Sequence, residues 1–150
     1  YSDAEELSEV IEAASPVGAI SKTKPLLVLT GGEPALQADN TLIEAMHVLG
    51  YKVAIETNGT LPIPSGIDWI TVSPKPHTEL VMQSGDELKL VYPQEGVLPE
   101  AYEHMNFKHF VLQPMDGKDL KKSIKACLLY CLAHPGWRLS VQSHKILGIR

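Results

Sequence analysis

Short apolar segments recur along the chain, and each of them stops at a polar corner or at glycine and proline. The pattern predicts β-strands over residues 26–30, 51–57, 67–73, 86–92, 108–114 and 137–145. The segment at 26–30, LLVLT, does not alternate apolar and polar residues, which is typical of a strand covered on both faces. The segment at 137–145, WRLSVQSHK, alternates better and is predicted to be an edge strand.

Amphipathic segments between these strands predict helices over 3–14, 35–50 and 119–134, with Gly50 and Pro135-Gly136 ending the second and third. Helix and strand alternate in the first half, so the sheet is expected to be mainly parallel. The connections between the second, third and fourth strands hold too little helix for a closed eightfold barrel. The sequence therefore predicts an α/β fold in a single domain over 1–150, built as a partial barrel or an open, curved sheet.

Four of the predicted strands end in corners whose residue types can bind a ligand. These corners are Thr30-Gly31-Gly32-Glu33-Pro34, Glu56-Thr57-Asn58-Gly59, Ser73-Pro74-Lys75 and Gln113-Pro114-Met115-Asp116. In a parallel sheet the carboxyl ends of the strands share one rim, where α/β proteins bind their ligands. Any single corner can be an ordinary turn, but four together favour a binding site.

The corner at Gly31-Gly32-Glu33-Pro34 favours a cationic ligand. A phosphate loop would need Lys-Ser or Lys-Thr at the start of the next helix, which this sequence lacks, and Glu33 would repel phosphate. A carboxylate beside exposed backbone suits an ammonium group, because charge-assisted hydrogen bonds are strong. The alternative is a tight turn in which Glu33 only places charge at a helix start.

Composition narrows the classes of function. The net charge is −5 without a basic block, which argues against a nucleic-acid partner. No apolar stretch reaches the roughly eighteen residues of a membrane helix, and no secretory signal is visible. The two cysteines, Cys127 and Cys131, are too few for a disulfide scaffold, so a reducing, cytoplasmic location is expected.

The corners also carry a family resemblance. Thr30 to Pro34 resembles the GGE motif of radical S-adenosylmethionine (SAM) enzymes, and the segments ETNGT, SPK, LQPMD and SHKILGIR resemble the 7-carboxy-7-deazaguanine synthase family. The resemblance spans nearly the whole chain. It implies a partial (incomplete) TIM-like barrel of the radical SAM type. The implied reaction is a lyase reaction on the path to queuosine and other 7-deazapurines, in which 6-carboxy-5,6,7,8-tetrahydropterin contracts to 7-carboxy-7-deazaguanine with loss of ammonia.

The resemblance assigns roles to individual residues. It implies SAM contacts at Gly32, Glu33, Ser73, Pro74, Lys75, Gln113, Pro114, Met115 and Asp116. It implies substrate contacts at Thr30, Glu56, His144 and Arg150. Other interpretations stay open: Lys75 as a solvated lysine, Glu56 as a rim charge, Asp116 as a helix N-cap and His144 as a surface residue of the edge strand. Alternation predicts that Lys145 faces away from His144, and Asn58-Gly59 is interpreted as a structural turn.

The sequence departs from the family at the iron–sulfur cluster. The family holds a [4Fe-4S] cluster on a C-x3-C-x2-C loop or an expanded variant, and nothing here matches it. Cys127 and Cys131 share one face of a helix in the wrong region and are interpreted as packing residues. The start at Tyr1 suggests the C-terminal portion of a longer core, with the cluster cysteines and the Mg²⁺ ligand expected upstream of Tyr1.

The family further implies a flavodoxin-like or ferredoxin-like electron donor and a homodimer. Three alternatives remain at this point: another radical SAM enzyme such as a glycyl-radical activase, a cluster-less ligand-binding α/β domain, or a plain α/β domain whose corners are turns.

Overall fold

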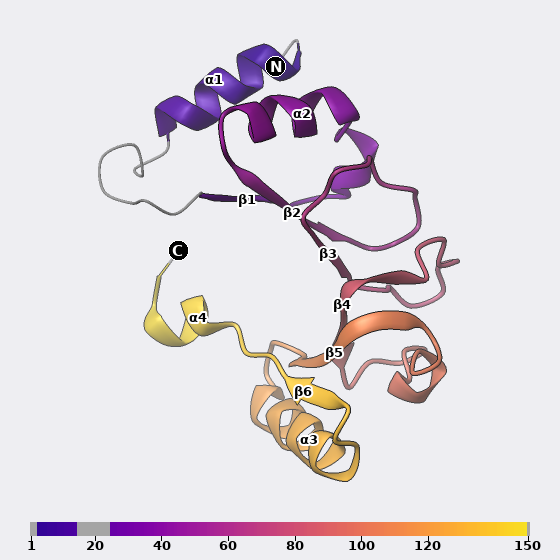
Figure 1. Cartoon of the computed structure of the whole chain (residues 1–150). Helices are drawn as coiled ribbons and strands as arrows, with labels where there is room; N and C mark the ends of the chain where they lie inside the picture. The colour runs from indigo at the N-terminus through magenta and orange to yellow at the C-terminus, as the bar shows by residue number, and fades with distance from the viewer. Residues whose placement is uncertain (1–2, 15–24, 150) are drawn as a thin grey trace. The chain divides into compact units, whose positions relative to one another are not determined.

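The computed structural model describes residues 3–14 and 25–149 (Figure 1). The chain divides into two compact units: unit 1 comprises residues 1–57 and 61–70, and unit 2 comprises residues 58–60 and 71–150. Strands pair in parallel within each unit, and helices pack on them. The predicted α/β class is confirmed, whereas the single domain over 1–150 stays a prediction.

Unit 1 is a two-helix layer on two parallel strands. Its elements are α1 (Ala4–Ala14), β1 (Leu26–Leu29), the 3₁₀ turn η2 (Pro34–Leu36), α2 (Asn40–Val48) and β2 (Lys52–Thr57). Leu27 of β1 stands opposite Val53 of β2. Both helices lie on the same side of these strands (Figure 1) and share a small core of Leu42, Ile43, Met46, Tyr51 and Val53.

The expectation that β1 is covered on both faces is wrong in the described structure. Leu27 and Leu29 pack against the core, but Leu26 and Val28 remain 59% and 44% exposed. The reason is geometric: successive side chains of a strand point to opposite faces, and α1 and α2 cover only one of them.

The helix predicted over 35–50 is interrupted. Pro34 begins η2, which ends at Leu36, and α2 begins only at Asn40. Asp39 is the N-cap of α2, because its carboxylate accepts a hydrogen bond of 2.8 Å from the Leu42 N–H. The predicted end at Gly50 is confirmed. The N–H groups of Gly50 and Tyr51 each bond a carbonyl of the last turn at 2.9 Å, and Gly50 takes a φ of 87° that favours glycine.

Unit 2 carries a longer run of parallel strands. The elements that complete the chain are β3 (Trp69–Val72), β4 (Ser84–Tyr92), η3 (Pro99–Ala101), β5 (Asn106–Pro114), α3 (Leu120–Ala133), β6 (Trp137–Leu139) and α4 (Ser143–Leu147). Thr71 and Val72 place the end of β3 beside β4, β5 follows, and β6 pairs with β5. Leu88, Leu90 and Leu112 are fully buried, and α3 packs against β5 and β6 (Figure 1).

The sixth strand is shorter than predicted. It ends at Leu139, and residues 143–147 form α4 instead of continuing the strand. Gly148 has a φ of 66°, and the Ile149 N–H bonds the His144 carbonyl at 2.9 Å, so a local helix-ending motif outweighs the short alternation. His144 therefore lies on a helix and not on an edge strand, and the alternation argument for Lys145 does not apply.

Candidate functional site

The chain leaves β1 through a corner that exposes its backbone. Thr30, Gly31 and Gly32 are exposed, and Gly31 adopts a φ of 115° that side chains rarely allow. Glu33 follows in an extended conformation and caps η2, since its Oε1 accepts a hydrogen bond of 3.1 Å from the Ala35 N–H. We call residues 30–34 the Glu33 corner.

A buried hydroxyl fixes the Glu33 carboxylate from the neighbouring strand. Thr57, at the end of β2, is 2% exposed, and its Oγ1 donates a hydrogen bond of 2.6 Å to Glu33 Oε1. The structure thus brings together the two corners that follow β1 and β2. Sequence reasoning treated Thr57 as part of a corner and missed this role, although its position at the end of β2 was the available signal.

Gly32 differs from Gly31 in its backbone conformation. A Cβ added at Gly32 would meet no heavy atom within 4 Å, and its φ is not in the left-handed region. Neither packing within the described chain nor backbone strain therefore requires a glycine at this position. The close approach of another molecule is a physical reason for glycine that remains.

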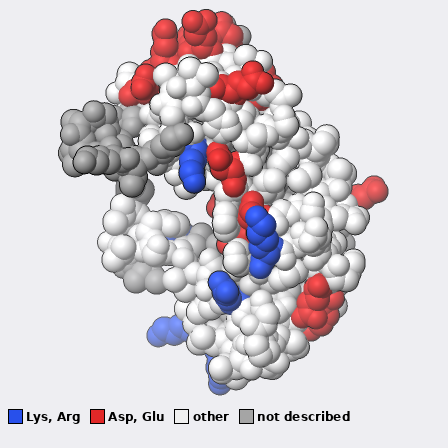
Figure 2. Space-filling view, viewed as in Figure 1, with Lys and Arg blue, Asp and Glu red and all other residues white. Residues whose placement is uncertain are grey.

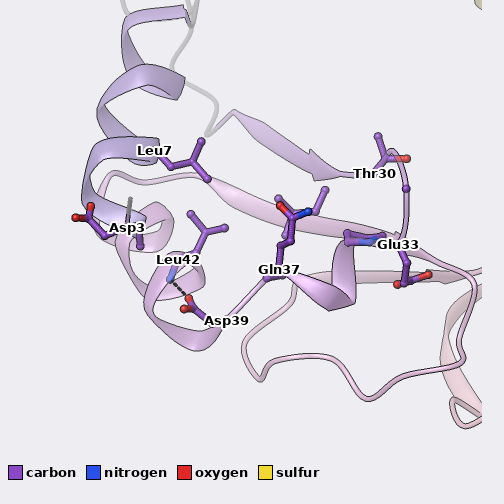
Figure 3. Close-up of a pocket in the computed structure, with 12 residues that line it drawn as sticks. Asp3, Leu7, Thr30, Glu33, Gln37, Asp39 and Leu42 are labelled. Carbon is purple, nitrogen blue, oxygen red and sulfur yellow. Dashed lines mark hydrogen bonds between the residues drawn. The ribbon is translucent and has the colours of Figure 1, made fainter. Parts of the chain in front are cut away.

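The Glu33 corner opens on a cavity of about 520 Å³ within unit 1. Figure 3 shows lining side chains from α1, the end of β1, η2 and the start of α2. The lining combines carboxylates with apolar carbons: Asp3, Ala4, Leu7, Leu29, Thr30, Gly32, Glu33, Pro34, Gln37, Ala38, Asp39 and Leu42. Such a lining suits a ligand that carries a positive charge on an apolar body. Glu56 is exposed on β2 and does not line this cavity.

In unit 2 the predicted corner after β3 is partly buried. Ser73 and Pro74 are buried, whereas Lys75 is exposed and its Nζ donates to Ser73 Oγ at 3.4 Å. Gly59 packs directly behind β3, because a Cβ there would lie 2.7 Å from Val72 Cγ1 and 2.5 Å from Leu80 Cδ1. Its φ of 77° confirms the interpretation of this position as a structural turn.

The corner after β5 is joined to β4 and to α4. The Met115 N–H bonds the Tyr92 carbonyl at 3.0 Å. Asp116 accepts hydrogen bonds from the Gly117 N–H at 2.9 Å and from Lys145 Nζ. These bonds, the one from Lys145 foremost, lower the pKa of Asp116 below its ordinary value. The alternative that Asp116 caps α3 is wrong, because the N-cap position is Asp119.

His144, next to Lys145, is exposed on α4, and Arg150 lies outside the described residues. The contact between Lys145 and Asp116 was missed by sequence reasoning, because the strand predicted over 137–145 assigned Lys145 the wrong local geometry.

The cysteines do not form a metal site. Cys127 is fully buried, and its thiol donates to the Tyr92 carbonyl at 3.4 Å. Burial raises the pKa of Cys127 to about 11, so the thiolate that iron requires is disfavoured. Within residues 3–14 and 25–149, no group of three or more His, Cys, Asp or Glu side chains could hold a metal ion. The described residues therefore do not fit a [4Fe-4S] cluster, and the interpretation of Cys127 as a packing residue is confirmed.

The charge distribution is uneven over unit 1. Figure 2 shows acidic side chains gathered over α1, which carries Glu5, Glu6, Glu9 and Glu12.

Of the helices in the described part of the chain, none has the length and apolar character needed to cross a membrane.

Comparison with known proteins gives consistent matches. The chain is 51% identical over 150 residues to 7-carboxy-7-deazaguanine synthase of Bradyrhizobium diazoefficiens, covering 100% of this chain and 70% of the relative. It is 48% identical over 149 residues to the enzyme of the same name from Caulobacter vibrioides, with 99% and 70% covered. The crystal structure of QueE from Escherichia coli matches with a TM-score of 0.71 and 27% identity over 93% of this chain and 63% of that one. No protein-family model matches the chain.

Proposed function

The chain belongs to the 7-carboxy-7-deazaguanine synthase family, and from this premise we propose that it provides SAM and substrate contacts of such an enzyme. The proposed reaction is the radical contraction of 6-carboxy-5,6,7,8-tetrahydropterin to 7-carboxy-7-deazaguanine with loss of ammonia. The observation that carries the proposal is the Glu33 corner, where an oriented carboxylate adjoins open backbone, and where Gly32 and Glu33 are among the residues that line one cavity.

Glu33 is the residue that we propose binds the amino group of SAM. Its carboxylate is oriented by Thr57 Oγ1 at 2.6 Å and by the Ala35 N–H at 3.1 Å, so little side-chain freedom remains to be lost when a ligand arrives. An ammonium group forms strong, charge-assisted hydrogen bonds with such a carboxylate. Gly32 leaves room for the cofactor to approach the backbone. SAM, when bound, supplies the radical chemistry of the reaction, and the protein supplies binding and orientation.

Further contacts are proposed residue by residue from the family. Thr30 and Glu56 would bind the pterin, with the Glu56 carboxylate accepting from the amino-pyrimidine edge. Ser73, Pro74, Lys75 and residues 113–116 would contact SAM, and His144 and Arg150 would contact the substrate. The burial of Ser73 and Pro74 supports an ordered backbone at their corner.

The remaining requirements of the reaction are also proposals. They comprise a [4Fe-4S] cluster, Mg²⁺, a flavodoxin-like or ferredoxin-like electron donor, a homodimer and a cytoplasmic location. The described residues contain no ligand set for the cluster. The reducing compartment rests on the small number of cysteines, which is too low for a disulfide scaffold.

The proposal is tested with the full-length protein, reconstituted anaerobically with iron and sulfide. Glu33→Gln removes the charge but keeps the size of the side chain, so the dissociation constant for SAM should rise at least about tenfold. Product formation from the carboxy-tetrahydropterin should fall with it. Isothermal titration and a chromatographic assay of the product measure the two effects.

Gly32→Ala supplies a sharper test. Its Cβ meets no protein atom within 4 Å, so thermal stability should stay unchanged while SAM binding weakens. Gly136→Ala is the matched control, since Gly136 is also exposed, without neighbours within 4 Å and without a left-handed φ. If neither Glu33→Gln nor Gly32→Ala changes SAM binding, the proposed site is wrong.

A second candidate function is ligand binding without turnover. It is one of the alternatives that the sequence alone left open. The same experiment separates the two candidates, because a binding domain would take up SAM and yet convert no pterin after reconstitution.

A further inference from the structure

The helix α4 is short, and four of its described side chains are exposed. It spans only Ser143–Leu147, and isolated helices of this length do not persist in water. Ser143, His144 and Lys145 are exposed, and Leu147 is 69% exposed, so burial of these side chains does not anchor it. The polar contacts of its described residues therefore contribute to its position.

Two contacts tie this segment to the end of β5. The first is at its base, where the Ser140 N–H bonds the Leu112 carbonyl at 2.8 Å. The second lies on the helix itself, where Lys145 Nζ donates to Asp116 Oδ2. Together the two contacts join both the base of this segment and the helix itself to the end of β5.

We propose that Lys145 is a positioning residue whose ion pair with Asp116 fixes α4 on the corner after β5 and thereby sets the place of His144. This inference rests on the proposed function, because it assigns a purpose to His144 as a substrate contact. Lys145 itself need not touch the substrate. Asp116 receives the Gly117 N–H on its other oxygen, so its carboxylate is held from both sides.

The chemistry of the pair predicts its behaviour. Both side chains are about half exposed, and exposed ion pairs are weak and screened by salt. The anchor should therefore release and re-form readily, and added salt should favour the released form. A hydrophobic anchor would respond to salt in the opposite sense.

The test compares three variants of the full-length protein: Lys145→Gln, Lys145→Arg and Lys121→Gln. Lys121 is an exposed lysine that makes no ion pair with any described residue, so its variant controls for the loss of one surface charge. Hydrogen exchange of the amides of residues 143–149, measured by mass spectrometry without ligands, reports on the anchor. Exchange should quicken at least threefold in Lys145→Gln and stay unchanged in the other two variants.

Salt and kinetics complete the test. Raising NaCl to 1 M should quicken exchange of the unmodified protein toward that of Lys145→Gln and leave that variant itself unaltered. In the reconstituted enzyme, Lys145→Gln should raise the KM for the carboxy-tetrahydropterin about three- to tenfold with little change in kcat, and Lys145→Arg should restore it.

Each result decides one part of the proposal. Equal exchange in Lys145→Gln and Lys121→Gln would overturn the anchor. Faster exchange with an unchanged KM would overturn the link to substrate binding. Failure of the unmodified enzyme to convert the pterin would overturn the proposed function instead, and the exchange data would still decide the anchor.

Discussion

The Glu33 corner and α4 hold their polar residues by opposite means. Glu33 is held from inside unit 1, because the hydroxyl that bonds it belongs to Thr57, a buried residue at the end of β2. Lys145 is held from outside, by an ion pair on the surface of unit 2. The first arrangement depends on the folded interior of unit 1. The second can open while unit 2 stays intact.

This difference suggests a division of labour within the proposed function. A rigid corner suits a cofactor group that must be bound in one geometry. An exposed ion pair, by contrast, holds its helix only weakly and is screened by salt. The predictions below test the differences between the two units and between the Glu33 corner and α4.

The largest effect is expected from the core beneath the Glu33 corner. Ile43→Ala should reduce the free energy of unfolding by about 2–5 kcal/mol, because it leaves a cavity in a core of few side chains. Val48→Ala, at an exposed position of the same helix, is the control. Urea unfolding followed by fluorescence is informative here, since Trp69 belongs to unit 1 and Trp137 to unit 2. If the fluorescence of Trp69 and that of Trp137 reported an equal loss of unfolding free energy, the two units would unfold together and the comparison would be wrong.

The next largest effect is expected in unit 2 at Gly59. Gly59→Ala should cost about 2–4 kcal/mol, because a left-handed φ and a Cβ 2.5 Å from Leu80 act together. Gly31→Ala is a matched comparison with a positive φ but no neighbour within 4 Å, so it should cost only about 1 kcal/mol. Thermal melting of both variants measures the difference. Similar losses of stability in the two variants would show that the contact of the added Cβ with Leu80 is relieved without a cost in free energy.

A smaller effect is expected from the hydrogen bond inside the Glu33 corner. Thr57→Val keeps the shape of the buried side chain but removes the hydroxyl that bonds Glu33. The free energy of unfolding should fall by about 1–2 kcal/mol, and SAM should bind about tenfold more weakly because Glu33 is less well oriented. Thr41→Val, at an exposed site of α2, should change neither quantity. Unaltered SAM affinity in Thr57→Val would show that the Thr57 hydroxyl does not orient Glu33 for binding.

The smallest effect is expected at Asp68 in unit 1, whose contribution to stability depends on pH. The Val53 N–H, foremost, and His47 lower the pKa of Asp68. A lowered pKa in the folded state adds stability above the unfolded pKa of about 3.9 and loses it as pH falls through the folded value. Asp68→Asn should therefore cost only ~0.5 kcal/mol at pH 7, since the pair is exposed, and the difference from the unmodified protein should vanish at low pH.

Melting temperatures between pH 7 and pH 3 test this sign. Glu44→Gln, at an exposed carboxylate of α2, provides the control. A gap between Asp68→Asn and the unmodified protein that widened toward pH 3 would contradict the assigned direction of the pKa shift.

The parts of the fold that follow from local chemistry were predictable from the sequence. Apolar runs located the strands, and Gly50 marked a helix end that needs a left-handed residue. The corner at Gly32 and Glu33 was predictable because its residue types restrict the ligands that it can bind. The orientation of Glu33 by Thr57 required the pairing of β1 and β2, which only the structure supplies.

The errors arose where distant contacts or competing local signals decide the outcome. LLVLT looks the same whether one face or two faces of β1 are covered, so composition could not reveal that Leu26 and Val28 are exposed. The segment at 137–145 alternates like a strand, but residues 143–147 form α4, because the helix-ending motif at Gly148 prevails. The ion pair of Lys145 and Asp116 joins residues far apart in the sequence, and no local pattern encodes it.

The apolar side chains that β1 leaves in water have a consequence for anyone who purifies this polypeptide. A strand surface that displays Leu26 and Val28 attracts other apolar surfaces, including those of further copies of the same chain. Precipitation on concentration and bright fluorescence with hydrophobic dyes are therefore expected from correctly folded material. Neither should be taken as a sign of misfolding, and dilute samples with a mild detergent are the sensible starting condition.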